Sequence, residues 1–189
     1  MGLLTENIEE KVKSKVKYPL KTDYRTAIKF EWLMQDGNIP DKEKIVGALL
    51  LFYGEIPEDI EKAVEDILWF YGGGKEENTK KEKKSDAKVQ SIYSFEFDDD
   101  LIYSAFLDQY GLDLQINTEL HWWKFKAMFK ALKEDNKIVE IMGYRAIDLT
   151  KIKDKSEREK YRKLKKLYAL PDMRSEEEKE RDFNSAFSF

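Results

Sequence analysis

Thr-Glu-Leu-His-Trp-Trp-Lys-Phe-Lys-Ala-Met-Phe-Lys-Ala-Leu, residues 118–132, is the stretch around which the chain is organised. At about 100° per residue, its polar side chains gather mainly on one narrow stripe, and apolar side chains occupy nearly all of the remaining surface. A helix that is apolar over so much of its girth is packed on more than one side. The stretch therefore predicts a buried central helix, capped by residue 117 or 118.

Two polar residues, His121 and Lys124, interrupt the apolar surface of this helix. They could form an acid/base pair in an aromatic pocket. The favoured interpretation is that they are core residues with satisfied polar atoms, because isolated polar groups on apolar faces usually serve packing. A buried lysine needs a partner, and Asp148 is the candidate. We expect Lys124 or Arg145 to pin the connector 144–149 to the central helix through a carboxylate.

Composition excludes several classes of site. The 189 residues include no cysteine and one histidine, which excludes disulfides and thiolate zinc sites and argues against a histidine-based metal site. A run of about 18 apolar residues and a signal-peptide pattern are both missing, so no membrane association is expected. The net charge of −4 argues against a general nucleic-acid binder.

The hydrophobic periodicity predicts a mainly α fold, a compact helical domain of about six to seven helices over residues 1–171. Short alternating patterns near residues 8–20 and 91–97 predict a small β-hairpin or short strands. Caps, prolines and glycines delimit the expected helices. These helices cover about residues 22–35, 40–53, 57–71, 99–110, 118–132, 137–142 and 156–168.

Several charged segments allow two interpretations. Residues 75–90 are read as a disordered loop because they hold almost no apolar side chain, and a basic recognition loop is the alternative. Residues 151–166 carry nine basic and three acidic side chains. This pattern is typical of a solvated helix, and a face for nucleic acid or an acidic partner is the alternative. Residues 172–189 are expected to be a flexible acidic and aromatic tail.

The acidic run Asp98, Asp99 and Asp100 suggests either a divalent cation or the start of a helix. The helix start is favoured, because the alternating ligands, glycine and later glutamate of a calcium loop are missing. No dinucleotide or phosphate-binding glycine motif occurs in the sequence, and no serine-nucleophile elbow accompanies His121. We therefore predict a non-enzymatic protein without cofactor or metal.

Several sequence blocks, in this order, resemble the bacteriophage gene product fifteen family of tailed phages and prophages of Gram-positive bacteria. The resemblance covers about residues 3–171. The most specific blocks are Leu-His-Trp-Trp-Lys-Phe at 120–125 and Gly-Tyr-Arg at 143–145. The other blocks are Thr-Asp-Tyr-Arg-Thr-Ala at 22–27, Leu-Phe-Tyr at 51–53, Ile-Pro-Glu-Asp at 56–59, Asp98 with Ile-Tyr-Ser-Ala-Phe at 102–106, Gln-Tyr-Gly-Leu-Asp-Leu at 109–114, Ile-Met at 141–142, Ile-Asp-Leu at 147–149 and Lys-Leu-Lys-Lys-Leu-Tyr at 163–168.

The resemblance implies a role in assembling the long tail of a siphovirus, since the family's genes lie in the tail module next to the tape-measure gene. It implies a tail assembly chaperone that binds the tape-measure protein, with the tail tube protein as a further candidate partner, in the host cell cytoplasm. A structural tail or head–tail connector component of the virion is the alternative, and a cell-wall hydrolase is third. Oligomeric state stays open. The structural or interaction candidates are His121, Trp122, Trp123, Lys124, Phe125, Tyr144, Arg145 and Asp148.

Overall fold

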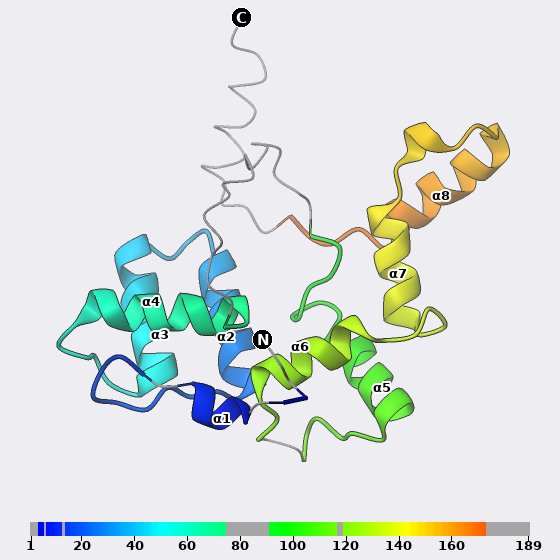
Figure 1. Ribbon diagram of the computed structural model, residues 1–189. Coiled ribbons are helices and arrows are strands. Elements are labelled where there is room, and N and C mark those ends of the chain that lie inside the picture. Colours follow the sequence, from blue (N-terminus) through cyan, green and yellow to red (C-terminus); the bar gives the residue numbers. More distant parts are fainter. Residues whose placement is uncertain (1–3, 6, 13, 75–90, 117–118, 173–189) are drawn as a thin grey trace, which may run out of the picture. The chain divides into compact units, whose positions relative to one another are not determined.

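The computed structural model describes residues 4–172 except 6, 13, 75–90, 117 and 118. Helices dominate this part of the chain (Figure 1). The sequence predictions for residues 75–90 and for the tail after Asp172 lie outside it. The elements are α1 (Ile8–Lys11), α2 (Tyr24–Gln35), α3 (Asp41–Tyr53), α4 (Ile60–Gly72), α5 (Asp99–Tyr110), α6 (Trp122–Lys130), α7 (Lys137–Ala146), the 3-10 helix η1 (Leu149–Lys151) and α8 (Lys155–Leu167).

The described residues separate into two compact units. Unit 1 contains residues up to 74 together with Glu119–Lys124 and Asp172, and unit 2 contains residues 91–116 and Phe125–Pro171. The first three residues of α6 therefore count with unit 1 and the others with unit 2. That both units belong to one domain over residues 1–171 stays a prediction.

Unit 1 is built from α2, α3 and α4, which pack in sequence order around a chain of aromatic rings. The rings of Phe30 and Phe52 lie 5.5 Å apart, those of Phe52 and Phe70 lie 6.0 Å apart, and Phe70 stacks on Trp123 at 5.6 Å. Ring pairs at these distances add to the stabilisation that burial itself gives. Each of the three helices therefore contributes at least one ring to a single core.

Unit 2 places α5 against α7, and α7 against α8. Its core is centred on Phe125, which stacks on Phe106 at 4.9 Å and on Phe129 at 6.2 Å. Ile138 and Ile141 of α7 are also buried. The C-terminal half of the α6 segment thus supplies the aromatic centre of unit 2, while its start supplies the tryptophans of unit 1.

The prediction of a β-hairpin or short strands near residues 8–20 and 91–97 is wrong for the described residues. Residues 8–11 form α1, and the backbone N–H of Lys15 donates to the Asp66 carboxylate at 2.6 Å instead of to a neighbouring strand. At the second site, Asp98 N donates to the carbonyl of Ser94 at 3.0 Å, which closes a turn. In the described part the one β pairing is an isolated bridge between Asp23 and His121.

Two helix boundaries also differ from the prediction. Helix α6 begins at Trp122, because Tyr24 N donates to the carbonyl of Leu120 at 2.9 Å and Trp122 N donates to that of Thr22 at 2.8 Å. This extended pairing occupies the residues expected to form the first turn. Helix α7 continues through Gly143 to Ala146, so its last residues are helical rather than part of a connector.

Candidate functional site

The two adjacent tryptophans of α6 cap the C-terminus of α4. The indole N–H of Trp122 donates to the carbonyl of Tyr71 at 3.1 Å, and that of Trp123 donates to the carbonyl of Phe70 at 2.7 Å. The carbonyl of Phe70 also accepts from Gly73 N at 3.0 Å, so Trp123 gives it a second donor. Trp122 donates to a carbonyl in the last turn, where the helix itself supplies no donor. Both indoles are 2% exposed. Trp122 and Trp123 therefore hold the start of α6 against the C-terminus of α4.

His121 caps the start of α6 from the inside of the aromatic cluster. Its Nδ1 accepts a hydrogen bond from Trp123 N at 3.1 Å, so the proton of the neutral ring is on Nε2. Nε2 is buried and has no acceptor within the described part of the chain. The ring meets Phe70 and Trp123 edge-on. Burial, followed by the charge of Lys124, lowers the pKa of His121 to about 4, so the ring is neutral at physiological pH.

Lys124 is exposed, in contrast to the buried position that the helical wheel indicates. The prediction that Lys124 is a core residue is therefore wrong, and the alternative of a buried acid/base pair loses one of its two members. The physical reason for expecting a carboxylate partner also disappears, because an exposed ammonium is solvated by water. Asp148, the expected partner, instead accepts from Thr150 N at 3.0 Å and lies 3.7 Å from the ammonium of Lys151.

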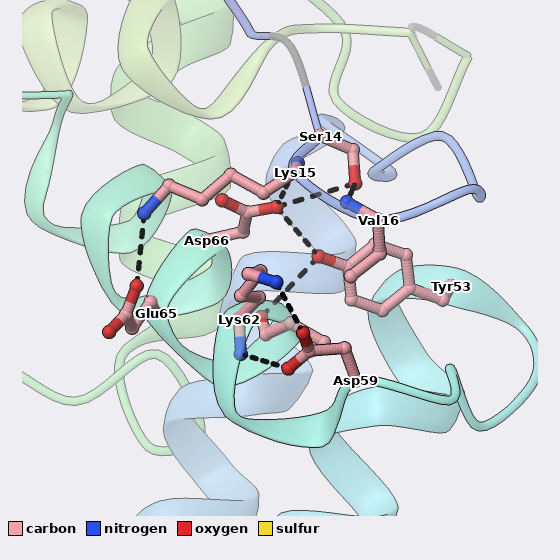
Figure 2. Close-up of polar contacts among 9 residues, drawn as sticks. Ser14, Lys15, Val16, Tyr53, Asp59, Lys62, Glu65 and Asp66 are labelled. Atoms are coloured by element: carbon pink, nitrogen blue, oxygen red, sulfur yellow. Dashed lines mark hydrogen bonds and ion pairs between the residues drawn. The ribbon is translucent and has the colours of Figure 1, made fainter.

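A buried carboxylate in unit 1 was missed by the sequence reasoning. Asp66 is 3% exposed, and its Oδ2 accepts from Lys15 N at 2.6 Å, from Ser14 Oγ at 3.3 Å and from the Tyr53 hydroxyl at 3.5 Å (Figure 2). Burial, together with Asp66, raises the pKa of Tyr53 to about 12. The helical spacing of the sequence could have indicated that Asp66 is buried, because it lies three residues after Ala63 on the buried face of α4.

The most connected polar side chain of unit 2 is Arg145, at the C-terminal end of α7. Its guanidinium forms a bidentate ion pair with Asp98, in which Nη1 donates to Oδ2 at 2.6 Å and Nη2 donates to Oδ1 at 2.9 Å. It also donates to the carbonyls of Tyr168 at 2.6 Å and Ile92 at 3.1 Å. The side chains of Arg145 and Asp98 are 9% and 3% exposed. Arg145 thereby joins the 92–98 turn, α5, α7 and the end of α8.

Asp98 occupies the N-cap position of α5 as predicted, but its side chain makes no capping hydrogen bond there. Its carboxylate instead accepts from Ser94 N at 2.9 Å and from Arg145. Asp99 and Asp100 lie in the first turn of α5, where the helix dipole favours negative charge. The sequence reasoning placed all three acids correctly and missed the ion pair.

The remaining candidates lie in unit 2 and have packing roles. Phe125 is 1% exposed at the core centre. Tyr144 stacks on Tyr168 at 5.8 Å and donates a short hydrogen bond to Glu140 of its own helix. The structure thus groups His121, Trp122 and Trp123 in unit 1, and Tyr144 and Arg145 at the α7–α8 contact in unit 2.

A cavity of about 400 Å³ opens beside the Arg145–Asp98 pair. The start of α5, one side of α7 and the segment after α8 line it. Phe97 and Leu167 are among its lining residues and are 41% and 71% exposed. Of its four charged lining residues, the largely buried side chains of Arg145 and Asp98 are paired with each other, and Asp100 and Lys137 are exposed. The other lining residues are apolar or aromatic, so the cavity combines apolar contacts with one exposed acid and one exposed cation.

Within the described ranges, no group of three or more His, Asp and Glu side chains is placed to hold a metal ion. In the same part of the chain, no helix is long and apolar enough to cross a membrane.

Comparison with known proteins gives one match, to a family. No curated protein and no solved structure matches the chain. The family model described as Bacteriophage Gp15 protein matches residues 6–170, which is most of the chain and covers most of the described residues of each unit. The chain therefore belongs to the Bacteriophage Gp15 protein family, whose members have a structural or morphogenesis role in phages.

Proposed function

We propose that the protein is a non-enzymatic tail assembly chaperone that binds the phage tape-measure protein in the host cell cytoplasm before the tail tube forms around it. Family membership supports a role in building the phage particle. The step from that role to a chaperone depends on one structural observation, which is the set of apolar side chains that the helices of unit 1 leave exposed.

Large exposed apolar side chains gather between residues 32 and 68. They come from α2, α3, α4 and the loop before α4, and each is at least 37% exposed. The set comprises Trp32, Met34, Ile45, Val46, Leu50, Ile56, Ile60 and Leu68. Single exposed apolar residues are ordinary on protein surfaces, whereas a contiguous apolar patch marks a surface that binds a partner, and the proposed binding requires these side chains to form one.

A helical partner suits such a surface. An amphipathic helix buries its apolar face on exposed apolar side chains, with contacts repeating at three- and four-residue spacing. Tape-measure proteins are long, largely helical and poorly soluble alone, so a protein that covers their apolar faces keeps them available for assembly. The high charge content of this chain, 38% Asp, Glu, Lys and Arg, would keep the complex soluble.

Co-expression with the tape-measure protein of the same phage tests the proposal. The wild-type chain should co-purify with it and raise its soluble fraction. The double variant Leu50→Ser/Leu68→Ser, whose sites are 46% and 57% exposed, should lose both effects while retaining its helical content. The matched control Leu107→Ser/Leu167→Ser, at sites 44% and 71% exposed in unit 2, should retain them. Absence of a complex with the wild-type chain would refute the proposal.

A permanent component of the virion is the competing function. It predicts a fixed number of copies of this chain in every purified particle, whereas a chaperone is released when the tube is complete. Quantitative mass spectrometry of purified virions, with the tail tube protein as internal standard, separates the two. A constant ratio in fully assembled particles would favour the structural role.

A further inference from the structure

Helix α8 carries a line of four cations next to the side that packs on α7, and three of the four are exposed. Its contact with α7 is made by Tyr161, whose ring lies 6.2 Å from that of Tyr144, and by residues one turn further on. At about 100° per residue, four basic residues fall about 60–140° around the helix from Tyr161, so they form a line that flanks this contact. These residues, here called the basic stripe, are Lys155, Arg158, Arg162 and Lys166.

The basic stripe is held in a fixed orientation although α8 contains no buried residue. Asp154 caps the helix by accepting from Glu157 N at 2.7 Å. Lys165 donates to the carbonyl of Ile147 at 2.9 Å, and Tyr168 at the helix end stacks on Tyr144. These contacts on one side of α8 set the direction of the basic stripe that flanks it. A partner would therefore meet cations that are already arranged, which lowers the entropic cost of binding.

Charges of the same sign are neighbours along the stripe. Arg158 and Arg162 are four residues apart, as are Arg162 and Lys166, and like charges at this spacing destabilise a helix. Within the described residues, one ion pair reaches the stripe, between Arg162 and Glu159. An acidic partner would relieve this repulsion, so the binding of a complementary charge and the stability of α8 are coupled.

The length of the stripe and the negative net charge of the rest of the chain indicate which kind of partner fits it. Lys155 and Lys166 are eleven residues apart, so the stripe extends about 16 Å along the helix axis. That matches about three turns of a second helix with acidic side chains on one face. A nucleic acid is a less suitable ligand. Residues 151–166 are strongly basic, but the whole chain has a net charge of −4, so the rest of the protein would repel a long polyanion.

We propose that the basic stripe of α8 is a docking surface for an acidic helical segment of a partner protein. This inference goes beyond the proposed function, since it concerns unit 2 and does not require the partner to be the tape-measure protein. It also differs from the apolar surface of unit 1 in its dependence on salt. Pairs between exposed charges are screened by ions, so docking on α8 should weaken as ionic strength rises.

Fluorescence anisotropy with a labelled alanine-based helical peptide tests this surface in the full-length protein. The probe carries glutamates on one face at four positions, and a control peptide carries glutamines there. The glutamate peptide should bind at 50 mM NaCl and the glutamine peptide should not. The variant Lys155→Gln/Arg162→Gln/Lys166→Gln should weaken binding roughly tenfold. Because the changed side chains are exposed and repel one another, the variant should keep its helical circular dichroism.

A matched variant controls for net charge. Lys42→Gln/Lys130→Gln/Lys133→Gln removes the same number of exposed cations from other helices and their ends, and should change affinity by less than about twofold. Equal losses in the two variants, or equal binding of the two peptides, would overturn the inference. Tighter binding of a 20-base-pair DNA duplex than of the glutamate peptide, lost in the stripe variant, would also overturn it in favour of nucleic acid.

Discussion

Replacing Arg145 by methionine should destabilise unit 2 more than any exposed substitution. The methionine keeps much of the apolar stem of the side chain and removes the guanidinium. That group connects Asp98 with the carbonyls of Ile92 and Tyr168. The change therefore removes the ion pair and leaves these acceptors without the donor that joined them.

The magnitude follows from burial. The Asp98 side chain is 3% exposed in the intact protein, and without Arg145 it retains Ser94 N, at 2.9 Å, as a donor. Removing one partner of a buried ion pair costs about 3–5 kcal/mol, because the other charge is left desolvated. At a denaturant dependence of about 2 kcal/mol per molar, the urea midpoint should fall by roughly 1.5–2.5 M.

Urea denaturation followed by far-UV circular dichroism measures this cost. The four tryptophans lie in unit 1, so tryptophan fluorescence does not report unit 2 directly. Arg162→Met is the matched control, because Arg162 forms an i,i+3 pair with Glu159 and its side chain is 54% exposed. It should cost about 1 kcal/mol or less. The double variant Asp98→Asn/Arg145→Met should cost less than the sum of its parts. Equal midpoints for Arg145→Met and Arg162→Met would refute the reasoning.

Three further predictions concern unit 1. Burial lowers the pKa of His121 to about 4, below the ~6.5 of an unfolded chain. This residue's contribution to the free energy of unfolding should therefore be complete above pH 6.5 and fall by up to about 3 kcal/mol as the pH drops to 4. A pH-independent difference between wild type and His121→Gln would contradict it. Gly74→Ala should lower the free energy of thermal unfolding by about 2 kcal/mol, because Gly74 has a φ of +67° and an added Cβ would lie 2.5 Å from a carbon of the Trp123 ring. The control Gly72→Ala should be neutral or stabilising, because an added Cβ there has no neighbour within 4 Å. Asp66→Ala should cost about 1–3 kcal/mol and expose residues 14–16 to limited proteolysis, while Tyr53→Phe, which removes long hydrogen bonds of 3.4 and 3.5 Å, should leave the cleavage pattern unchanged.

The helices of this fold that could be predicted from sequence are those whose ends are set by local chemistry. Asp23 accepts from Thr26 N and starts α2. Gly54 and Gly111 end α3 and α5 with positive φ values of 81° and 61°. A cap acts within a few residues of itself, so it can be recognised in one sequence.

The errors occur where a distant partner decides the local structure. The alternating pattern around Lys15 indicates a strand, but its backbone N–H binds a carboxylate of α4. The first turn expected for the central helix is lost because Leu120 and Trp122 pair with the chain before α2. In both cases the competing hydrogen bond comes from residues far along the chain, and spacing within the segment contains no information about it.

The candidate site was predicted only in part, because its partners also come from residues far along the chain. Arg145 was predicted to pin residues 144–149 to the central helix through a carboxylate, but it binds Asp98 at the start of α5 and the carbonyls of Ile92 and Tyr168. Lys124 was placed in an apolar surface by the helical wheel, but the wheel cannot tell which part of that surface a neighbouring element covers. Partner identity requires the three-dimensional arrangement, whereas the need for a partner is visible in the sequence.

The division of unit 1 in the sequence has a consequence during protein synthesis. The residues that cap α4, Trp122 and Trp123, leave the ribosome only after residues 81–118 have been made. Until then, α2, α3 and α4 are present without the aromatic rings that complete their core. A nascent chain that ends before residue 119 should therefore expose the apolar core of unit 1 to solvent and chaperones, and it should become compact as the tryptophans emerge. The rate of translation through residues 81–118 would then set how long this vulnerable intermediate persists.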